Sequence, residues 1–111
     1  MNPVVLFLTC ADEREADEIT DALLRKKLVV CIKKTKVESS FLFKGKTDAA
    51  DEVMLIMDSI EKNFSAIENE VRKIHSYETF VLLASPVIKS SKGINGWIKT
   101  ELRTWMLQLI D

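Results

Sequence analysis

The sequence predicts one α+β domain with a ferredoxin-like β-α-β-β-α-β order, both helices on one face of an antiparallel sheet, and an additional C-terminal helix. Three observations lead there. A chain of 111 residues suits a single domain, here 1–111. Four apolar segments alternate with two segments of helical periodicity in that order. Right-handed crossovers around the two helices then bring the four strands into one antiparallel sheet.

The first strand and helix occupy the N-terminal quarter of the chain. Residues 3–10 (PVVLFLTC) are apolar on both faces, which is typical of a buried central strand. Asp12 is an N-cap candidate, and Glu15 three residues later completes a capping-box pattern. The helix that follows carries one stripe of residues at helical spacing: Ala16, Ile19, Leu23 and Lys27.

The middle of the chain predicts two strands joined by a tight turn. Residues 28–32 (LVVCI) begin the second strand, which we expect to continue to Phe43. Residues 44–46 (KGK) form the turn, because glycine tolerates a positive φ. Residues 52–57 (EVMLIM) form the third strand.

The C-terminal half predicts a helix, a strand and a second helix. Asp58 or Ser59 is expected to cap the first of these helices. Its apolar residues are spaced by 4, 3, 4 and 3: Ile60, Phe64, Ile67, Val71 and Ile74. The fourth strand is expected over 79–88, then a polar loop over 89–93 and a helix over 96–110. That last helix has apolar residues on several faces, among them Trp97, Ile98, Leu102, Trp105 and Leu109. Together with the apolar strands it predicts contact with another subunit.

Composition narrows the classes of partner. A net charge of −1 gives no general attraction to nucleic-acid phosphates or anionic membranes, so we expect neither partner. No segment approaches the roughly 18 apolar residues of a membrane span. The two cysteines lie in apolar runs, and the apolar N-terminus lacks the basic region of an export signal. Free thiols without export favour a reducing cytoplasm.

The junction between the second helix and the fourth strand holds the only histidine and the only tyrosine, His75 and Tyr77. Imidazole and carboxylate are both ligands for zinc or copper, so His75 and Glu78 are metal-ligand candidates. One histidine cannot complete such a site, which would need Cys10, another carboxylate or a neighbouring subunit. The alternative is structural: a protonated His75 favoured by the C-terminal end of the helix dipole.

Cys10 ends the first strand immediately before a helix N-terminus. That place could lower the thiol pKa and make Cys10 a thiolate ligand, whereas the alternative is a small buried hydrophobe. Phe41, Phe43 and Trp97 are expected to be core or interface anchors rather than a base-stacking surface. The sequence contains no phosphate-binding glycine loop, dinucleotide fingerprint or nucleophile elbow, so we expect no enzyme.

Several segments in this order resemble the CutA divalent-cation tolerance family. Residues 28–32 (LVVCI) are similar to its L-A-A-C-V strand, residues 41–46 (FLFKGK) to its Y-W-W-x-G-K turn, and residues 75–78 (HSYE) to its H-P-Y-E motif. Pro86-Val87 and Trp97-Ile98 also match the pattern. The resemblance implies a ferredoxin-like homotrimer, divalent-metal binding in some members, notably of copper, and no established catalysis.

The departures from that pattern concern the metal site. Ser76 stands in place of the motif's proline, and Phe80-Val81 replaces a P-E pair. Some members carry a metal-binding cysteine where this chain has Leu8, while Cys10 lies two residues further on the same strand face.

Two functional hypotheses follow from the residues and the resemblance. In the first, a homotrimer binds Cu²⁺ or Zn²⁺ in a cleft between subunits through His75, Glu78 and Cys10, in response to metal ions. In the second, a non-enzymatic trimer binds a small molecule or a protein in that cleft. There Tyr77 would make a polar contact, and Phe41, Phe43 and Trp97 an apolar wall.

Overall fold

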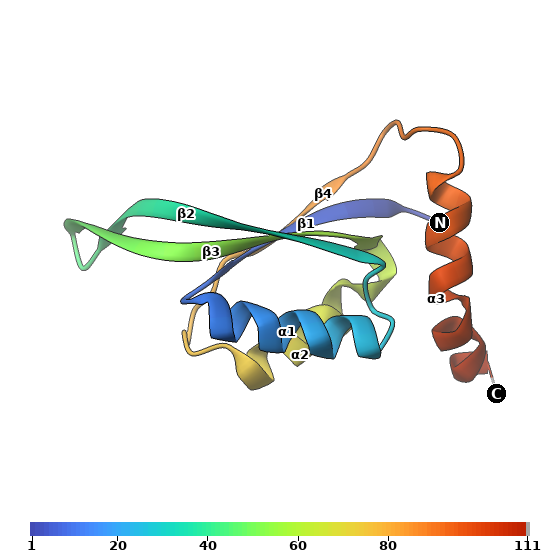
Figure 1. The fold of residues 1–111 in the computed structure, drawn as a ribbon, viewed down its shortest axis with the longest axis horizontal. Coiled ribbons are helices and arrows are strands. Elements are labelled where there is room, and N and C mark those ends of the chain that lie inside the picture. Colours follow the sequence, from blue (N-terminus) through green and yellow to red (C-terminus); the bar gives the residue numbers. More distant parts are fainter. Residues whose placement is uncertain (111) are drawn as a thin grey trace.

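The computed structural model describes residues 1–110, with side chains as far as residue 102. A four-stranded sheet has helices α1 and α2 side by side on one face, and helix α3 stands at one end (Figure 1). The elements are β1 (Pro3–Cys10), α1 (Glu13–Arg25), β2 (Cys31–Phe43), β3 (Lys46–Ile60), α2 (Phe64–Ile74), β4 (Leu82–Pro86) and α3 (Ile94–Ile110). The strand order is β2-β3-β1-β4, and every pair is antiparallel. The predicted α+β fold with a four-stranded antiparallel sheet is confirmed.

The start of the chain folds as its sequence predicts, with one difference. β1 has the expected bounds, and the Asp12 side chain caps α1 by accepting the Glu15 backbone N–H at 2.9 Å. In a capping box the Glu15 carboxylate would accept a hydrogen bond from the backbone N–H of Asp12. Instead it accepts the N–H of Ala11 at 2.8 Å, which places it beside the end of β1.

β3 is much longer than the predicted 52–57, and a tight turn explains why. Lys44 and Gly45 both have positive φ, 52° and 78°, as a two-residue type I′ hairpin requires. This turn sets the register from Phe43↔Lys46 to Cys31↔Asp58. The polar residues that precede Glu52 are therefore held in the sheet by pairing with β2.

The second helix begins later than predicted, and the fourth strand is shorter. β3 runs to Ile60, a 3-10 turn covers Glu61–Asn63, and α2 starts at Phe64. Neither Asp58 nor Ser59 is a helix cap. Ser59 is buried, and its hydroxyl donates to the Leu28 carbonyl oxygen. β4 covers only 82–86 of the predicted 79–88, because residues 75–81 form a loop that passes the end of β1.

The core lies between the sheet and the pair α1 and α2. Alternate residues of β1 are buried, so this strand is buried on one face only and not on both. Fully buried side chains of β1 and β3 pack against those of the two helices: Leu6, Leu8, Leu55 and Met57 against Ile19, Leu23, Ile67 and Val71.

The distal part of the β2–β3 hairpin, residues 37–52 (the arm), extends past the helices (Figure 1). It makes the molecule elongated: the radius of gyration is 15.0 Å, against about 13 Å for a compact chain of this length. Phe41, Leu42 and Phe43 near its tip are 39%, 79% and 58% exposed. The arm is therefore a projection with an apolar tip and no core of its own.

Helix α3 packs on the opposite end of the sheet from the arm (Figure 1). Ile98 and Leu102 form a small cluster with Ile60, and Trp97 is 43% exposed. The predicted apolar positions Trp105 and Leu109 have side chains outside the described residues. None of the described helices has the length and hydropathy to cross a membrane.

Candidate functional site

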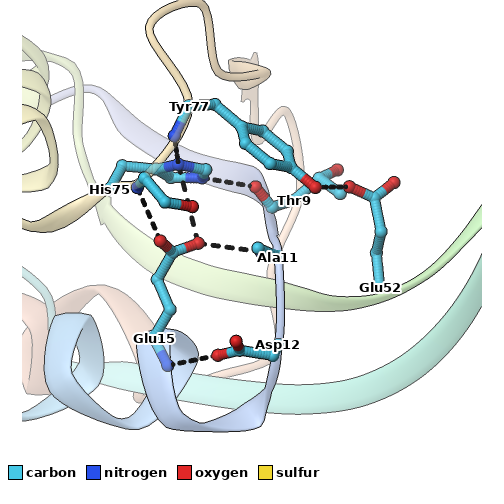
Figure 2. A network of polar contacts seen from close by, with 8 residues as sticks. Thr9, Ala11, Asp12, Glu15, Glu52, His75 and Tyr77 are labelled. Carbon is cyan, nitrogen blue, oxygen red and sulfur yellow. Dashed lines mark hydrogen bonds and ion pairs between the residues drawn. The ribbon is translucent and has the colours of Figure 1, made fainter.

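A network of buried polar groups forms where β1 ends, α1 begins and α2 ends (Figure 2). His75 is the C-cap residue of α2 and has an extended backbone, with ψ of 135°. The chain therefore leaves the helix there and turns toward β1. This brings together one ligand-type atom each of Cys10, Glu15 and His75, all within 4.8 Å of one another.

Both ring nitrogens of His75 have backbone partners. Nε2 lies 2.8 Å from the Thr9 carbonyl oxygen, and Nδ1 lies 3.1 Å from the Tyr77 backbone nitrogen. A carbonyl can only accept and an amide N–H can only donate, so Nε2 carries the hydrogen and Nδ1 offers its lone pair. We assign a neutral imidazole. The expected protonated side chain stabilising the end of α2 is thus replaced by a link to β1.

The Glu15 carboxylate accepts two backbone N–H groups. Oε2 bonds the N–H of Ala11 at 2.8 Å, and Oε1 bonds the N–H of Ser76 at 2.6 Å. Burial alone would raise the pKa of Glu15, but these hydrogen bonds outweigh it and hold the pKa below its usual value. Glu15 is therefore an ionised clamp between the start of α1 and the loop after α2.

Cys10 is fully buried in this network. Burial, and then the negative charges of Glu15, Asp12 and Glu52, raise the pKa of its thiol to about 12. The expectation that the following helix lowers this pKa is wrong, because desolvation and three carboxylates outweigh the helix dipole. At neutral pH Cys10 is a protonated, buried thiol.

Tyr77 and Glu52 form a second contact beside this network (Figure 2). The Tyr77 hydroxyl donates to Glu52 Oε2 at 2.6 Å. This hydrogen bond, then burial, then the charges of Glu52, Glu15 and Asp12 raise the pKa of Tyr77 to about 12. Sequence reasoning missed Glu15 and Glu52 as site residues. Glu15 had the capping-box pattern as its sequence signal and Glu52 precedes the apolar run of β3, but neither signal indicated a place in this network.

The remaining predicted site residues lie elsewhere. Glu78 has an exposed side chain, and its carbonyl oxygen accepts from Arg72. Phe41 and Phe43 are at the tip of the arm, and Trp97 is in α3 at the other end of the sheet. Within one chain the structure brings Cys10, His75 and Tyr77 together, and it does not bring the others to them.

The donor set does not fit a resident Cu²⁺ or Zn²⁺ in this arrangement. Such an ion needs deprotonated sulfur and nitrogen or oxygen lone pairs that are free to coordinate. Here both His75 nitrogens have backbone partners, so no imidazole lone pair is free, and the Cys10 thiol is protonated while no metal is bound.

Comparison with known proteins identifies the family. The sequence model described as CutA1 divalent ion tolerance protein matches residues 4–101. The chain belongs to the CutA1 family. The resemblance of its motifs is thereby confirmed.

Relatives in this family share the fold over most of the chain. The divalent-cation tolerance protein CutA of Archaeoglobus fulgidus is 32% identical over 84% of this chain and 91% of its own length. The structure described as the periplasmic divalent cation tolerance protein CutA from that organism has a TM-score of 0.87. The match covers 90% of this chain and 98% of that one. The structure of CutA1 from Shewanella sp. SIB1 has a TM-score of 0.85 and is 29% identical in sequence; the match covers 89% of this chain and 94% of that one. Human CutA is 29% identical over 84% of this chain, which spans about half of that protein (52%).

Proposed function

We propose that this CutA1-family chain is a non-enzymatic homotrimer that serves tolerance to divalent cations. The observation that carries the proposal is the face of the sheet opposite α1 and α2, here called the open face. On the open face, apolar residues of three strands stand where the structure provides no covering layer. This arrangement supports a ferredoxin-like subunit built for assembly.

The open face follows from the alternation of strand residues. Because Leu6, Leu8, Leu55 and Met57 point toward the helices, their neighbours point the opposite way. These neighbours include Val5, Phe7, Met54 and Ile56, which are partly exposed. Leu83 of β4 pairs with Phe7 on the same face and is 60% exposed. No described helix lies over this side (Figure 1). A sheet with an apolar face requires a second layer, and an apolar patch on a small domain marks an interface.

The arm supports the same proposal. A two-stranded ribbon alone is at best marginally stable in water, yet residues 37–52 extend beyond the core with Phe41, Leu42 and Phe43 exposed. Contact with neighbouring copies would bury these side chains. Three copies is the number that the family resemblance implies, and a head-to-tail contact of this kind closes into a ring.

Sedimentation velocity tests the assembly. We expect a species of roughly three times the 12.7 kDa chain mass at micromolar concentration. Leu83→Glu, which places a charge on the open face, should shift the protein toward monomer. Leu24→Glu is the matched control, because Leu24 is a 42% exposed leucine of α1 on the helix side. A wild-type monomer at these concentrations would refute the proposal.

Direct binding of a cation is a second candidate, favoured by the proximity of Cys10, Glu15 and His75. It requires His75 to release a backbone partner and the Cys10 thiol to lose its proton. Calorimetric titration of Cu²⁺ and Zn²⁺ into wild type and His75→Ala tests it, with Glu78→Ala as a test of the exposed carboxylate. A heat that His75→Ala abolishes supports the candidate, and equal, negligible heats in wild type and variants remove it. Binding through His75 requires a neutral imidazole and should weaken as the pH falls.

A further inference from the structure

Glu52 is a buried carboxylate with incomplete hydrogen bonding. Only 8% of the residue is exposed, and its one bond within the described part of the chain is from the Tyr77 hydroxyl. An ionised carboxylate can accept about four hydrogen bonds, and Glu52 Oε1, which is not fully buried, is open to a donor from outside the chain. The single chain therefore leaves one oxygen of this carboxylate without a hydrogen-bond donor among the described residues.

The surroundings of Glu52 do not supply a cationic partner. Asp12 and Glu15 add negative charge near Tyr77 and Cys10. Lys34, one of the lysines of β2, is already bonded to Glu13 and Asp17 at 3.0 and 2.8 Å. His75 is neutral. Among the described residues no lysine or arginine forms an ion pair with Glu52, so the site favours a positive group from outside the chain.

The tip of the arm offers such a group beside apolar side chains. Residues 41–47 (FLFKGKT) hold two lysines and no acidic residue. Lys46 is exposed and lies directly across the hairpin from Phe43, on the face that also carries Phe41. Lys46 and Glu52 are six residues apart along β3, which is about 20 Å at 3.3 Å per residue. They cannot pair within one chain.

We propose that the Glu52–Tyr77 site binds the arm tip of a second copy of this chain. The Lys46 ammonium of one copy pairs with the Glu52 carboxylate of the next, and Phe43 packs beside Tyr77. The charges are complementary, and the contact buries apolar side chains that one chain leaves exposed. It rests on the proposed assembly and deepens it. Each copy has one tip and one site, so the contact runs head to tail and is completed when a ring closes.

Charge reversal tests the pairing. Lys46→Glu and Glu52→Lys should each raise the dissociation constant of the assembly at least tenfold in sedimentation equilibrium. The double variant K46E/E52K restores an opposite pair at every contact and should recover most of this loss. Lys44→Glu is the matched control: it makes the same change of charge in the same turn, but the Lys44 ammonium already lies 5.3 Å from the centre of the Phe43 ring. Circular dichroism establishes that each variant is folded, and Glu52→Gln replaces Glu52→Lys if the lysine prevents folding.

The outcomes separate this inference from the proposed function. If wild type is monomeric, the assembly itself is refuted. If wild type assembles and single reversals leave its dissociation constant unchanged, the assembly stands and the Lys46–Glu52 pairing is overturned. The pairing is also overturned if Lys44→Glu weakens assembly as much as Lys46→Glu, or if the double variant recovers nothing. Stabilisation of the Glu52 site by Zn²⁺ alone, lost in Glu52→Gln with assembly unchanged, would assign the site to a free cation instead.

Discussion

Replacing Glu15 with glutamine should destabilise the fold, because this carboxylate joins two segments far apart in sequence. It accepts the N–H of Ala11 at 2.8 Å and that of Ser76 at 2.6 Å. A hydrogen bond to a charged acceptor contributes about 1.5–3 kcal/mol, and an unsatisfied buried donor costs about 1–3 kcal/mol. The glutamine carbonyl oxygen can still accept from one of these two N–H groups, but its NH₂ group would then face the other N–H, and two donors cannot bond to each other. We expect the free energy of unfolding to fall by about 2–4 kcal/mol at pH 7.

Urea unfolding followed by circular dichroism measures this loss, at several protein concentrations because assembly contributes to stability. The control is Glu18→Gln, since Glu18 is an exposed residue of the same helix that pairs only with Arg14 at 3.4 Å.

The pKa of Glu15 is lowered in the folded state. Its stabilisation is therefore present above its unfolded pKa of about 4.3 and is lost as the pH falls through the folded value. The difference between wild type and Glu15→Gln should shrink in acid. A difference below about 0.5 kcal/mol at pH 7, as for an ordinary surface change, would refute the assigned role.

Two further predictions concern the neighbours of Glu15. Thiol labelling of the native protein should modify Cys31, which is partly exposed, and spare Cys10, which is buried and has a pKa raised to about 12; peptide mass spectrometry distinguishes them, and equal labelling of both contradicts the burial of Cys10. Ser76→Pro removes one donor to Glu15 and should lower the unfolding free energy by about 1–2 kcal/mol, because proline's restriction of the unfolded chain offsets part of the lost bond. Urea unfolding measures it, and an unchanged or higher stability would contradict the contribution assigned to this bond.

The element order was predictable because burial imposes periodicity. The apolar residues of α2 are spaced for one helix face, and Ile67 and Val71 of that stripe are fully buried. The N-terminal half of β3 was not predictable in this way. Residues 46–51 have no apolar alternation, since they lie beyond the helices, and they are strand only because the Lys44-Gly45 turn sets their pairing with β2. The residue types at 46–51 therefore do not indicate that this segment pairs with β2.

The sequence predicted which residues of the junction after α2 belong to the candidate site, but it did not predict the distant residues that they contact. His75 and Tyr77 are distinctive by composition, but Glu15 meets Ser76 across 61 positions and Glu52 meets Tyr77 across 25. Those contacts depend on how α2 returns the chain to β1. The neutral state of His75 also depends on them, because the Thr9 carbonyl and the Tyr77 N–H determine which nitrogen carries the hydrogen.

Ser76 connects the altered family motif to the hydrogen bonding of Glu15. His75 keeps ψ at 135°, the extended conformation that a residue before proline adopts. The loop thus retains the shape that the H-P-Y-E pattern implies, although the proline is absent. Serine has the backbone N–H that proline lacks, and that N–H donates to Glu15 Oε1 at 2.6 Å. One substitution therefore preserves the backbone path and adds a hydrogen bond to the Glu15 carboxylate. Through that bond, the departure from the motif ties the start of α1 to the loop that follows α2.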